Sequence, residues 1–277
     1  MALKDKAIAV SVSVNKPQMT KKDNAVTCEV ALDKNASSSA IAVIKNLYPK
    51  HLVEPINVVE GAARRYVESV TAPWGRGVNL LPSALFMEFK DNINKFELQF
   101  HQAVTVFLNN YANVLAQAQT EQGDMFDGGQ YPDMAHLKAG FSFSVRYLPI
   151  ATGGDVVLAL EKDTLKELQD EIEKQTKEML AEAMKVNHQR LHDAVERIYT
   201  QCSKPEGRIY DTLTGNLDEL LRVLPSLDLN DDPVFRDLCM KAARLVVSPD
   251  TIKASPEKRE EMAKDAKAIL ASMKGVW

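Results

Sequence analysis

The sequence predicts an α+β protein that is mostly α-helical, with two long antiparallel helices, shorter helices and a small antiparallel β-sheet. Two long segments, 84–119 and 162–201, place apolar residues every three or four positions, as an amphipathic helix does. Two short segments, 7–14 and 141–148, alternate apolar with polar residues, as a half-buried strand does. Because the helical segments are much longer than the strands, helices are expected to dominate the fold.

The N-terminal segment is expected to form a β-hairpin followed by two helices. Residues 7–14 alternate Ile and Val with Ala and Ser, which predicts a strand with its Ile and Val side chains buried. Residues 15–24 are polar and contain a proline, so they predict a turn or a long hairpin loop. Residues 26–32 are the expected returning strand, and helices are expected at about 36–48 and 54–71.

The middle of the chain predicts a loop, a long helix and a second hairpin. Prolines and glycines are so dense in residues 72–82 that they predict an irregular loop. The helix at 84–119 would extend roughly 54 Å, at about 1.5 Å per residue, and end at Gly123. A short helix is expected near 133–139. The strand at 141–148 is then expected to pair with a short strand at 156–160.

The C-terminal part is expected to be entirely helical. The long helix at 162–201 carries a dense cover of charges around its apolar stripe. Three shorter helices are expected at about 207–224, 233–246 and 256–273. The last two begin with an N-cap residue followed by proline at the first helical position, in Asp232-Pro233 and Ser255-Pro256.

One continuous domain with two parts is the expected organisation. Residues 1–160 would form a mixed α/β core with basic loops and the first long helix, and residues 161–277 an acidic helical part packed on it. The apolar stripes of the long helices are close to heptad spacing. They would pair with each other inside one chain or, alternatively, form a coiled-coil dimer.

Charge is unevenly distributed along the sequence. The net charge is −4, which by itself argues against nucleic acid as a partner. Residues 1–100, however, hold 13 Lys+Arg against 10 Asp+Glu, and the remaining residues hold 21 against 28. A mildly basic N-terminal part is therefore joined to an acidic part.

Composition indicates a soluble globular protein of the cytoplasm. Apolar residues make up 45% and charged residues 26% of the chain. The longest apolar runs are too short to span a bilayer, and the N-terminus lacks a signal-peptide pattern. Cys28, Cys202 and Cys239 are far apart, which favours a reducing compartment over a disulfide or zinc framework.

The motifs of common enzyme classes are absent from the sequence. It contains no P-loop, no nucleophile elbow and no dinucleotide-binding glycine pattern. His188 and His192 have zinc-ligand spacing, but HQRLH lacks the zincin glutamate, so exposed helical histidines are expected. Asp124, Asp127 and Asp155 lie beside glycines and are expected to form turns. We expect a protein that is not an enzyme, with no cofactor and no metal.

Basic residues interleaved with aromatic ones are the strongest candidates for a binding site. Single strands are bound in this way, with cations along the phosphates and rings beneath the bases. Alternatives remain for three of these residues: Trp74 as a plug over the core, and Arg64 and Arg65 as solvated helical arginines. Tyr147, aligned with Phe141 and Phe143, is expected in the core. The candidate nucleic-acid-binding residues are Lys16, Lys21, Lys22, Arg64, Arg65, Tyr66, Trp74, Arg76 and Arg146.

Four motifs give the chain a resemblance to a family of bacteriophage proteins. They are TAPWGRGVNLLP (71–82), FxxAVxxFLxxY (100–111), MFDGGQYP (125–132) and FSFSVRYLPIxxGGD (141–155), and the similarity covers nearly the whole chain. The chain is also similar to a phage single-stranded DNA-binding protein that acts as an RNA polymerase cofactor and does not have an OB-fold. The site residues above are predicted from charge and aromaticity, not carried over from that protein.

The resemblance implies a non-enzymatic single-stranded DNA-binding protein that serves phage transcription or replication in the bacterial host cytoplasm. Its expected partners are single-stranded DNA and the phage RNA polymerase, with a homo-oligomer as a further option and no membrane. The alternative is a helical adaptor or assembly protein without DNA affinity. If Lys21, Arg64, Arg76 and Arg146 share one face, DNA binding is favoured; if they are scattered, the adaptor is favoured.

Overall fold

The computed structural model describes residues 3–204 and 207–275, and it confirms an α+β protein that is mostly helical. The chain forms two compact units. Unit 1 comprises Met1–Ser11, Tyr66–Phe89 and Arg146–Trp277, and unit 2 comprises Val12–Arg65 and Lys90–Val145. The boundary expected between residues 160 and 161 lies inside unit 1. Among the described residues, no helix is long and apolar enough to cross a membrane.

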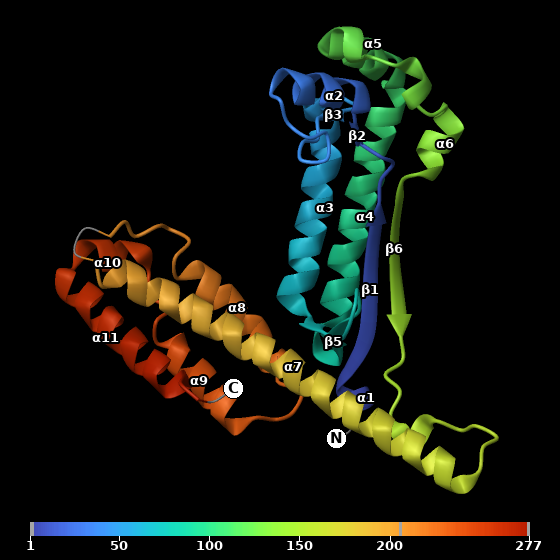
Figure 1. The fold of residues 1–277 in the computed structure, drawn as a ribbon. Coiled ribbons are helices and arrows are strands. Elements are labelled where there is room, and N and C mark those ends of the chain that lie inside the picture. The colour runs from blue at the N-terminus through green and yellow to red at the C-terminus, as the bar shows by residue number, and fades with distance from the viewer. Residues whose placement is uncertain (1–2, 205–206, 276–277) are drawn as a thin grey trace. The chain divides into compact units, whose positions relative to one another are not determined.

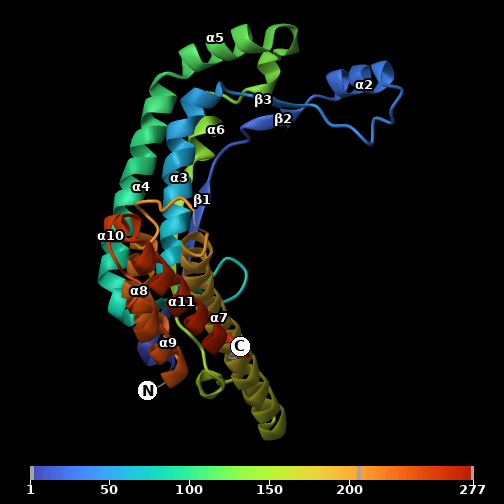
Figure 2. The same cartoon turned by 90° about the vertical axis from the view of Figure 1, so that its left-hand side faces the viewer.

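Two antiparallel helices form the body of unit 2. Helices α3 (Lys50–Val70) and α4 (Phe86–Asn109) lie side by side in both views (Figures 1 and 2). The prediction of a helix at 54–71 is thereby confirmed. Phe100 of α4 packs against Phe141 and Phe143, at centroid distances of 6.4 and 5.8 Å. The other buried side chains of these helices in unit 2 are Val53, Ile56, Ala63, Ile93, Val104 and Phe107.

The long helix expected at 84–119 is interrupted at Asn110. Asn110 has φ −102° and ψ 11°, and its Nδ2 donates a hydrogen bond of 2.8 Å to the carbonyl of Val106. Such a side chain competes for a backbone acceptor and favours a helix end, so α5 (Tyr111–Gln122) begins as a separate helix. The expected end at Gly123 is confirmed.

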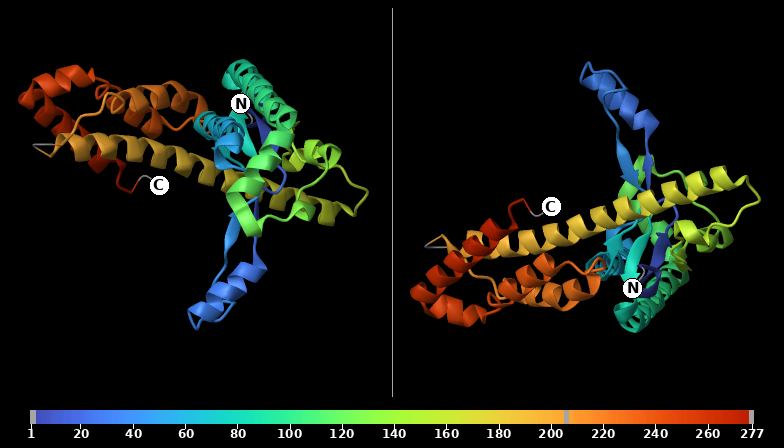
Figure 3. Two further views of the ribbon diagram at one scale, coloured as in Figure 1. Left: turned by 90° about the horizontal axis from the view of Figure 1, so that it is seen from above. Right: turned by 90° about the horizontal axis from the view of Figure 1, so that it is seen from below.

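A projecting arm, residues 20–46, replaces the hairpin expected near the N-terminus. Strands β2 (Thr20–Lys22) and β3 (Ile44–Asn46) pair antiparallel, and α2 (Asn24–Asp33) lies between them in sequence. Figures 2 and 3 show the arm extending away from α3 and α4 within unit 2. The strand expected at 26–32 and the helix expected at 36–48 are therefore wrong.

Local capping explains why residues 26–32 are helical. The carboxylate of Asp23 accepts a hydrogen bond of 3.2 Å from the backbone N–H of Val26, which starts α2. The backbone N–H of Val43 donates to the hydroxyl of Thr27 at 3.0 Å and ties the returning chain to the helix. The apolar residues of α2 form no stripe, so periodicity gave no helix signal.

Aromatic rings close the end of unit 2 nearest the arm. The ring of Tyr48 contacts Phe107, Tyr111 and Tyr131 at centroid distances of 5.5 to 6.3 Å. The hydroxyl of Tyr131 donates to the carbonyl of Leu47 at 2.7 Å. Helix α6 (Met134–Ala139) follows, as predicted, with Asp133 as its N-cap. The short 3-10 turns η2 (Gly123–Met125) and η3 (Gly128–Gln130) connect these elements.

The four-stranded sheet has the order β4-β5-β1-β6, from β4 (Ala72–Pro73), β5 (Asn79–Pro82), β1 (Ala7–Asn15) and β6 (Ser142–Leu148). Strands β1 and β5 are antiparallel, with Ala7 opposite Pro82 and Val10 opposite Asn79. The segment expected as an irregular loop is therefore a hairpin of β4 and β5, followed by η1 (Ser83–Leu85). The strands expected at 7–14 and 141–148 are confirmed.

Strand β6 does not pair with residues 156–160, which form no strand. Its neighbour in the sheet is β1. After β6 the chain turns through η4 (Gly153–Asp155), where Asp155 accepts hydrogen bonds from the backbone N–H and the hydroxyl of Thr152. A Cβ at Gly153 would lie 2.3 Å from the carbonyl oxygen of Gln169, so η4 packs directly on helix α7. The expected second hairpin is therefore wrong.

At the beginning of β1, side chains on both faces of the strand are buried, so the expected alternation of buried and exposed residues is wrong there. Ala7 and Ala9 are buried in the core of unit 1, although Ile8 was expected on the buried face and is only half-buried. Small side chains let the neighbouring layer approach the strand closely. Val10 is completely buried, as expected.

The helical layer of unit 1 is built on α7 (Lys162–Cys202), which confirms the second long helix. Its most extensive partner in unit 1 is α11 (Pro256–Met273), and α8 (Gly215–Leu227) and α9 (Pro233–Ala243) also pack on it. In unit 2 the helix beside α4 is α3. Each of the two long helices, α4 and α7, therefore packs against another helix of its own unit.

Helix ends in this layer follow the predicted caps closely. Asp232 Oδ1 accepts from the N–H of Val234 at 2.8 Å, and Ser255 Oγ accepts from the N–H of Lys258 at 3.1 Å. The helix expected at 207–224 begins only at Gly215, and α10 (Pro249–Ala254) is additional. The N-terminal α1 (Leu3–Lys6) is a single turn.

Candidate nucleic-acid interface

The nine predicted site residues are divided between the two units. Unit 2 holds the five cations Lys16, Lys21, Lys22, Arg64 and Arg65, which we call the basic stretch. Unit 1 holds Tyr66, Trp74, Arg76 and Arg146. The four residues chosen to test for a shared face are likewise divided, two in each unit.

One glutamate connects two members of the basic stretch. Lys16 donates to Asn57 Oδ1 at 2.6 Å and forms an ion pair with Glu60. Arg64 donates to the same carboxylate through Nε at 3.1 Å and Nη2 at 2.8 Å. Burial raises the pKa of Glu60, but the two cations outweigh it and hold the pKa below its usual value. Glu60 is therefore ionised, and it cancels one of the two positive charges.

Lys21 and Lys22 lie exposed on β2 of the arm. Neither forms an ion pair with any carboxylate in the part of the chain that the structure describes. The one acid between them and α2, Asp23, is used to cap α2 and to pair with the buried Lys45 at 3.4 Å. Lys45 also donates to the carbonyl of Met125 and so anchors the arm to the rest of unit 2. Two exposed lysines are therefore left on the arm without an ion pair among the described residues, and Lys21 acts on a carboxylate only at a distance, by contributing to the lowered pKa of Asp127.

Lys16 shares Glu60 with Arg64 of α3 and is also close to the arm in sequence. Five peptide units join Lys16 to Lys21, so their Cα atoms are at most about 17 Å apart. Arg65 is exposed beside Arg64 on α3.

Aromatic members of the predicted site are packed against other side chains of unit 1. Tyr66 stacks on Phe89 with a centroid distance of 6.0 Å and an interplanar angle of 21°. Trp74 is partly buried and packs against the core, which supports its alternative role as a plug. Tyr147, expected in the core, is 38% exposed and lies 5.4 Å from the ring of Phe86.

The two units divide the charged residues differently from the two sequence segments, 1–100 and 101–277. Unit 2 contains 11 Lys+Arg and 11 Asp+Glu, and unit 1 contains 23 and 27. The basic excess of residues 1–100 is therefore not carried by either unit as a whole. Positive potential on unit 2 has to be local, at the exposed cations of the basic stretch.

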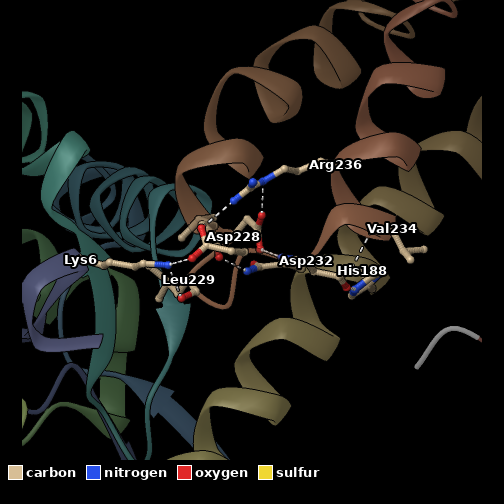
Figure 4. A network of polar contacts seen from close by, with 10 residues as sticks. Lys6, His188, Asp228, Leu229, Asp232, Val234 and Arg236 are labelled. Carbon is tan, nitrogen blue, oxygen red and sulfur yellow. Dashed lines mark hydrogen bonds and ion pairs between the residues drawn. The ribbon is translucent and has the colours of Figure 1, made fainter. Parts of the chain in front are cut away.

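A network of acids and bases in unit 1 was not predicted (Figure 4). The side chain of Asp228 is fully buried and accepts hydrogen bonds from Arg236 Nε at 2.6 Å and the N–H of Asp232 at 2.8 Å. Asp231 pairs with Arg236 and with Lys6, and Lys6 also donates to the carbonyl of Leu229 at 3.1 Å. The sequence signal was a run of aspartates just before the capped helix α9, with Arg236 four residues after the cap.

His188 belongs to the same region and is buried, against the expectation of an exposed histidine. Its Nε2 lies 3.4 Å from Asp232 Oδ2, and its ring lies 4.6 Å from that of Phe235. Burial lowers the pKa of His188, and Asp232 only partly offsets this. Because Asp232 also caps α9, the pair joins α7 to α9. A cavity of about 480 Å³ opens beside it, lined by Glu178, Glu182 and Lys185.

The zinc-like spacing of His188 and His192 produces no two-histidine cluster among the described residues. Their one group with metal-ligand proximity is His192, Asp193 and Glu196, whose ligand atoms lie within 4.8 Å of one another. All three come from one turn of α7, and exposed acidic groups of this kind are common without an ion.

Asp127 and Asp155 form turns as predicted, and two of the cysteines are buried. Cys202 and Cys239 are buried, and burial raises the pKa of both thiols, that of Cys239 to about 12. Asp127 caps η3 by accepting from the N–H of Gly129, and Asp155 forms the capping box of η4. These residues are explained by packing and turn formation.

Comparison of the chain with protein-family models, curated proteins and solved structures gives no significant match. The binding site proposed below therefore depends on the placement of the residues described above, and the phage role proposed with it on the sequence resemblance.

Proposed function

We propose that the protein binds single-stranded DNA without sequence preference, as a non-enzymatic factor in phage transcription or replication, through the basic stretch of unit 2. The observation that carries the proposal is that five of the seven predicted cations lie in one unit, with Lys21 and Lys22 exposed and outside any described ion pair. Positive side chains along a strand neutralise phosphates and release counterions, which requires no base recognition.

Binding of this kind should be weak and sensitive to salt. Glu60 cancels part of the charge of the basic stretch, and unit 2 has no net charge. Tyr66 and Trp74 already pack on other side chains, so few rings remain to stack bases. The contact with a protein partner, such as the phage RNA polymerase, is proposed to lie on the acidic unit 1.

Fluorescence anisotropy of a labelled single-stranded oligonucleotide, measured over a salt series, tests the proposal. We expect affinity for the single strand at about 50 mM salt that falls steeply as salt rises. The variant Lys21→Ala/Lys22→Ala should lower the slope of log affinity against log salt by about 1.4, or roughly 0.7 for each lost phosphate contact.

The matched control is Lys162→Ala/Lys166→Ala, which removes two exposed lysines at the beginning of α7 in unit 1. Its slope should equal that of the wild type. No affinity for the single strand at low salt would refute the proposal. Equal loss of slope in both variants would show diffuse attraction without a site on the arm.

The arm also supports a second candidate, a helical adaptor or assembly protein. Leu32 and Ile44 are 80% and 63% exposed on the arm, where both apolar side chains are accessible to a protein partner. If this candidate holds, Leu32→Ser/Ile44→Ser should abolish self-association or partner binding. Analytical ultracentrifugation beside the anisotropy assay separates the two candidates, because the adaptor has no oligonucleotide affinity to lose.

A further inference from the structure

An open cavity of about 700 Å³ lies in unit 1 where the end of α7 meets α10 and the first turns of α11. Its volume falls in the range of about 300–1,000 Å³ that is typical of small-molecule sites. Tyr199, Cys202, Ile252, Arg259, Lys264 and Lys267 are among the residues that line it. None of them belongs to the predicted nucleic-acid interface.

The lining of this cavity is basic although unit 1 is acidic. Among the described residues, the lining holds four cations, from Lys253, Arg259, Lys264 and Lys267, and one carboxylate, that of Glu260. Lys253 is paired with Asp211 and Asp250. Lys264 and Lys267 have no ion pair among the described residues and lie on the same face of α11, three residues apart. An anion entering the cavity would therefore meet two lysines that form no ion pair with any carboxylate that the structure describes.

Helix ends add to this preference for an anion. Pro256, at the first position of α11, lines the cavity, so the partially positive end of an 18-residue helix faces it. The opposing negative end of α7 is partly covered, because Arg259 donates hydrogen bonds to the carbonyls of Gln201, at 2.9 Å, and of Gly207.

The rest of the lining is mostly apolar, with Ser203 as its one hydroxyl besides that of Tyr199 among the described residues. Cys202 and Ile252 are buried, and burial raises the pKa of the Cys202 thiol, so that it stays neutral. The ring of Tyr199 is half-buried against the core and faces the cavity from α7. A ligand that fits this lining has an anionic group and a flat apolar portion.

We propose that this cavity binds a nucleoside phosphate, with the phosphate at Lys264 and Lys267 and the base against Tyr199. The ligand is either a free nucleotide or one unit of a nucleic-acid strand, because both present the same phosphate beside a planar base. The proposal goes beyond the DNA interface of unit 2 and does not depend on it.

Isothermal titration of the full chain with a deoxynucleoside 5′-monophosphate, the matching nucleoside and inorganic phosphate tests this site. The monophosphate should bind saturably and more tightly than either part alone. Lys264→Ala/Lys267→Ala should weaken it by about tenfold or more, since a lost charge-assisted contact of about 1.4 kcal/mol corresponds to tenfold. Tyr199→Leu should weaken the monophosphate but leave inorganic phosphate unchanged. Lys162→Ala/Lys166→Ala, matched in charge, should have no effect.

Absence of saturable binding by the wild type would overturn the proposal, and so would equal binding of the monophosphate and inorganic phosphate. Loss of oligonucleotide affinity in Lys264→Ala/Lys267→Ala would identify a strand as the source of the ligand, and unchanged affinity a free nucleotide. If monophosphate binds but no oligonucleotide does, this proposal stands and the function proposed for unit 2 fails.

Discussion

At the scale of single residues, the partners of an ionisable side chain decide how much charge it presents to a ligand. Lys16 and Arg64 count as two positive charges in the sequence, but both bind Glu60. Lys45 is buried against Asp23 and a carbonyl, whereas Lys21, opposite it in the ladder, is exposed. Charge patterns in the sequence therefore identified basic segments without showing which lysines remain available to a ligand.

Tyrosine burial in unit 2 gives a prediction for alkaline pH. Burial, followed by the neighbouring Tyr111, raises the pKa of Tyr48 far above its ordinary value near 10, and burial also raises the pKa values of Tyr111 and Tyr131. The unfolded chain therefore loses these protons first. Stability is fully present below about pH 10 and falls as the pH rises above it.

Urea unfolding at about pH 9 and pH 11 checks this dependence in the wild type and in Tyr48→Phe. The variant should lose less stability between the two pH values, because one of the raised pKa values is gone. Tyr210→Phe, at an exposed tyrosine of unit 1, is the control and should behave as the wild type. The same alkaline loss in all three proteins would assign the effect to other groups.

At the scale of elements, it was easier to predict whether a segment forms a helix or a strand than to predict which other element it pairs with or packs against. The strands at 7–14 and 141–148 are present, but β6 pairs with β1 instead of the segment that follows it. The apolar stripe of α7 is present, but its main partner inside unit 1 is α11. Periodicity shows which face of an element is buried, and many partners can cover the same face.

Backbone geometry at the end of α5 gives a prediction at this scale. Gly123 has φ +53° and ψ −127°, which side-chain-bearing residues rarely adopt. Gly123→Ala should lower the free energy of unfolding by about 1–3 kcal/mol. Gly128→Ala is the control, because its φ is ordinary and a Cβ would meet only Phe126, at 3.8 Å. Chemical denaturation of both variants checks this, and equal stability would contradict the strain.

At the scale of the whole molecule, the units are not consecutive stretches of sequence. Unit 1 takes its core from the N-terminal strand, the β4–β5 hairpin and the C-terminal helices. Arg190 of α7 donates to the carbonyls of Thr71 at 2.9 Å and Glu68 at 2.6 Å, and Ala72 and Leu80 are buried in the same core. The C-terminal helices are thus completed by segments more than a hundred residues away.

A fragment of residues 161–277 tests this interdependence. It contains all of α7 to α11 but lacks the strands that cover them, so it should not unfold cooperatively by far-UV circular dichroism. Its amide NMR spectrum should be poorly dispersed compared with that of the full chain. A cooperative transition with well-dispersed signals would instead support the division at residue 160 that the sequence suggested.

Sequence patterns were enough to predict the mostly helical α+β class, the two long apolar stripes, the strands at 7–14 and 141–148, and the capped starts at Asp232 and Ser255. These are local properties, set by side-chain periodicity and by hydrogen bonds within a few residues. The structure was needed to show that residues 26–32 form a helix on an arm, that β6 pairs with β1, that Glu60 pairs with Lys16 and Arg64, and that His188 is buried. The helix at 26–32 starts at a local cap, but its apolar residues form no stripe that periodicity detects. The pairing of β6 with β1, the Lys16–Glu60 ion pair and the burial of His188 depend on contacts between segments distant in sequence, whose free energy no local pattern records.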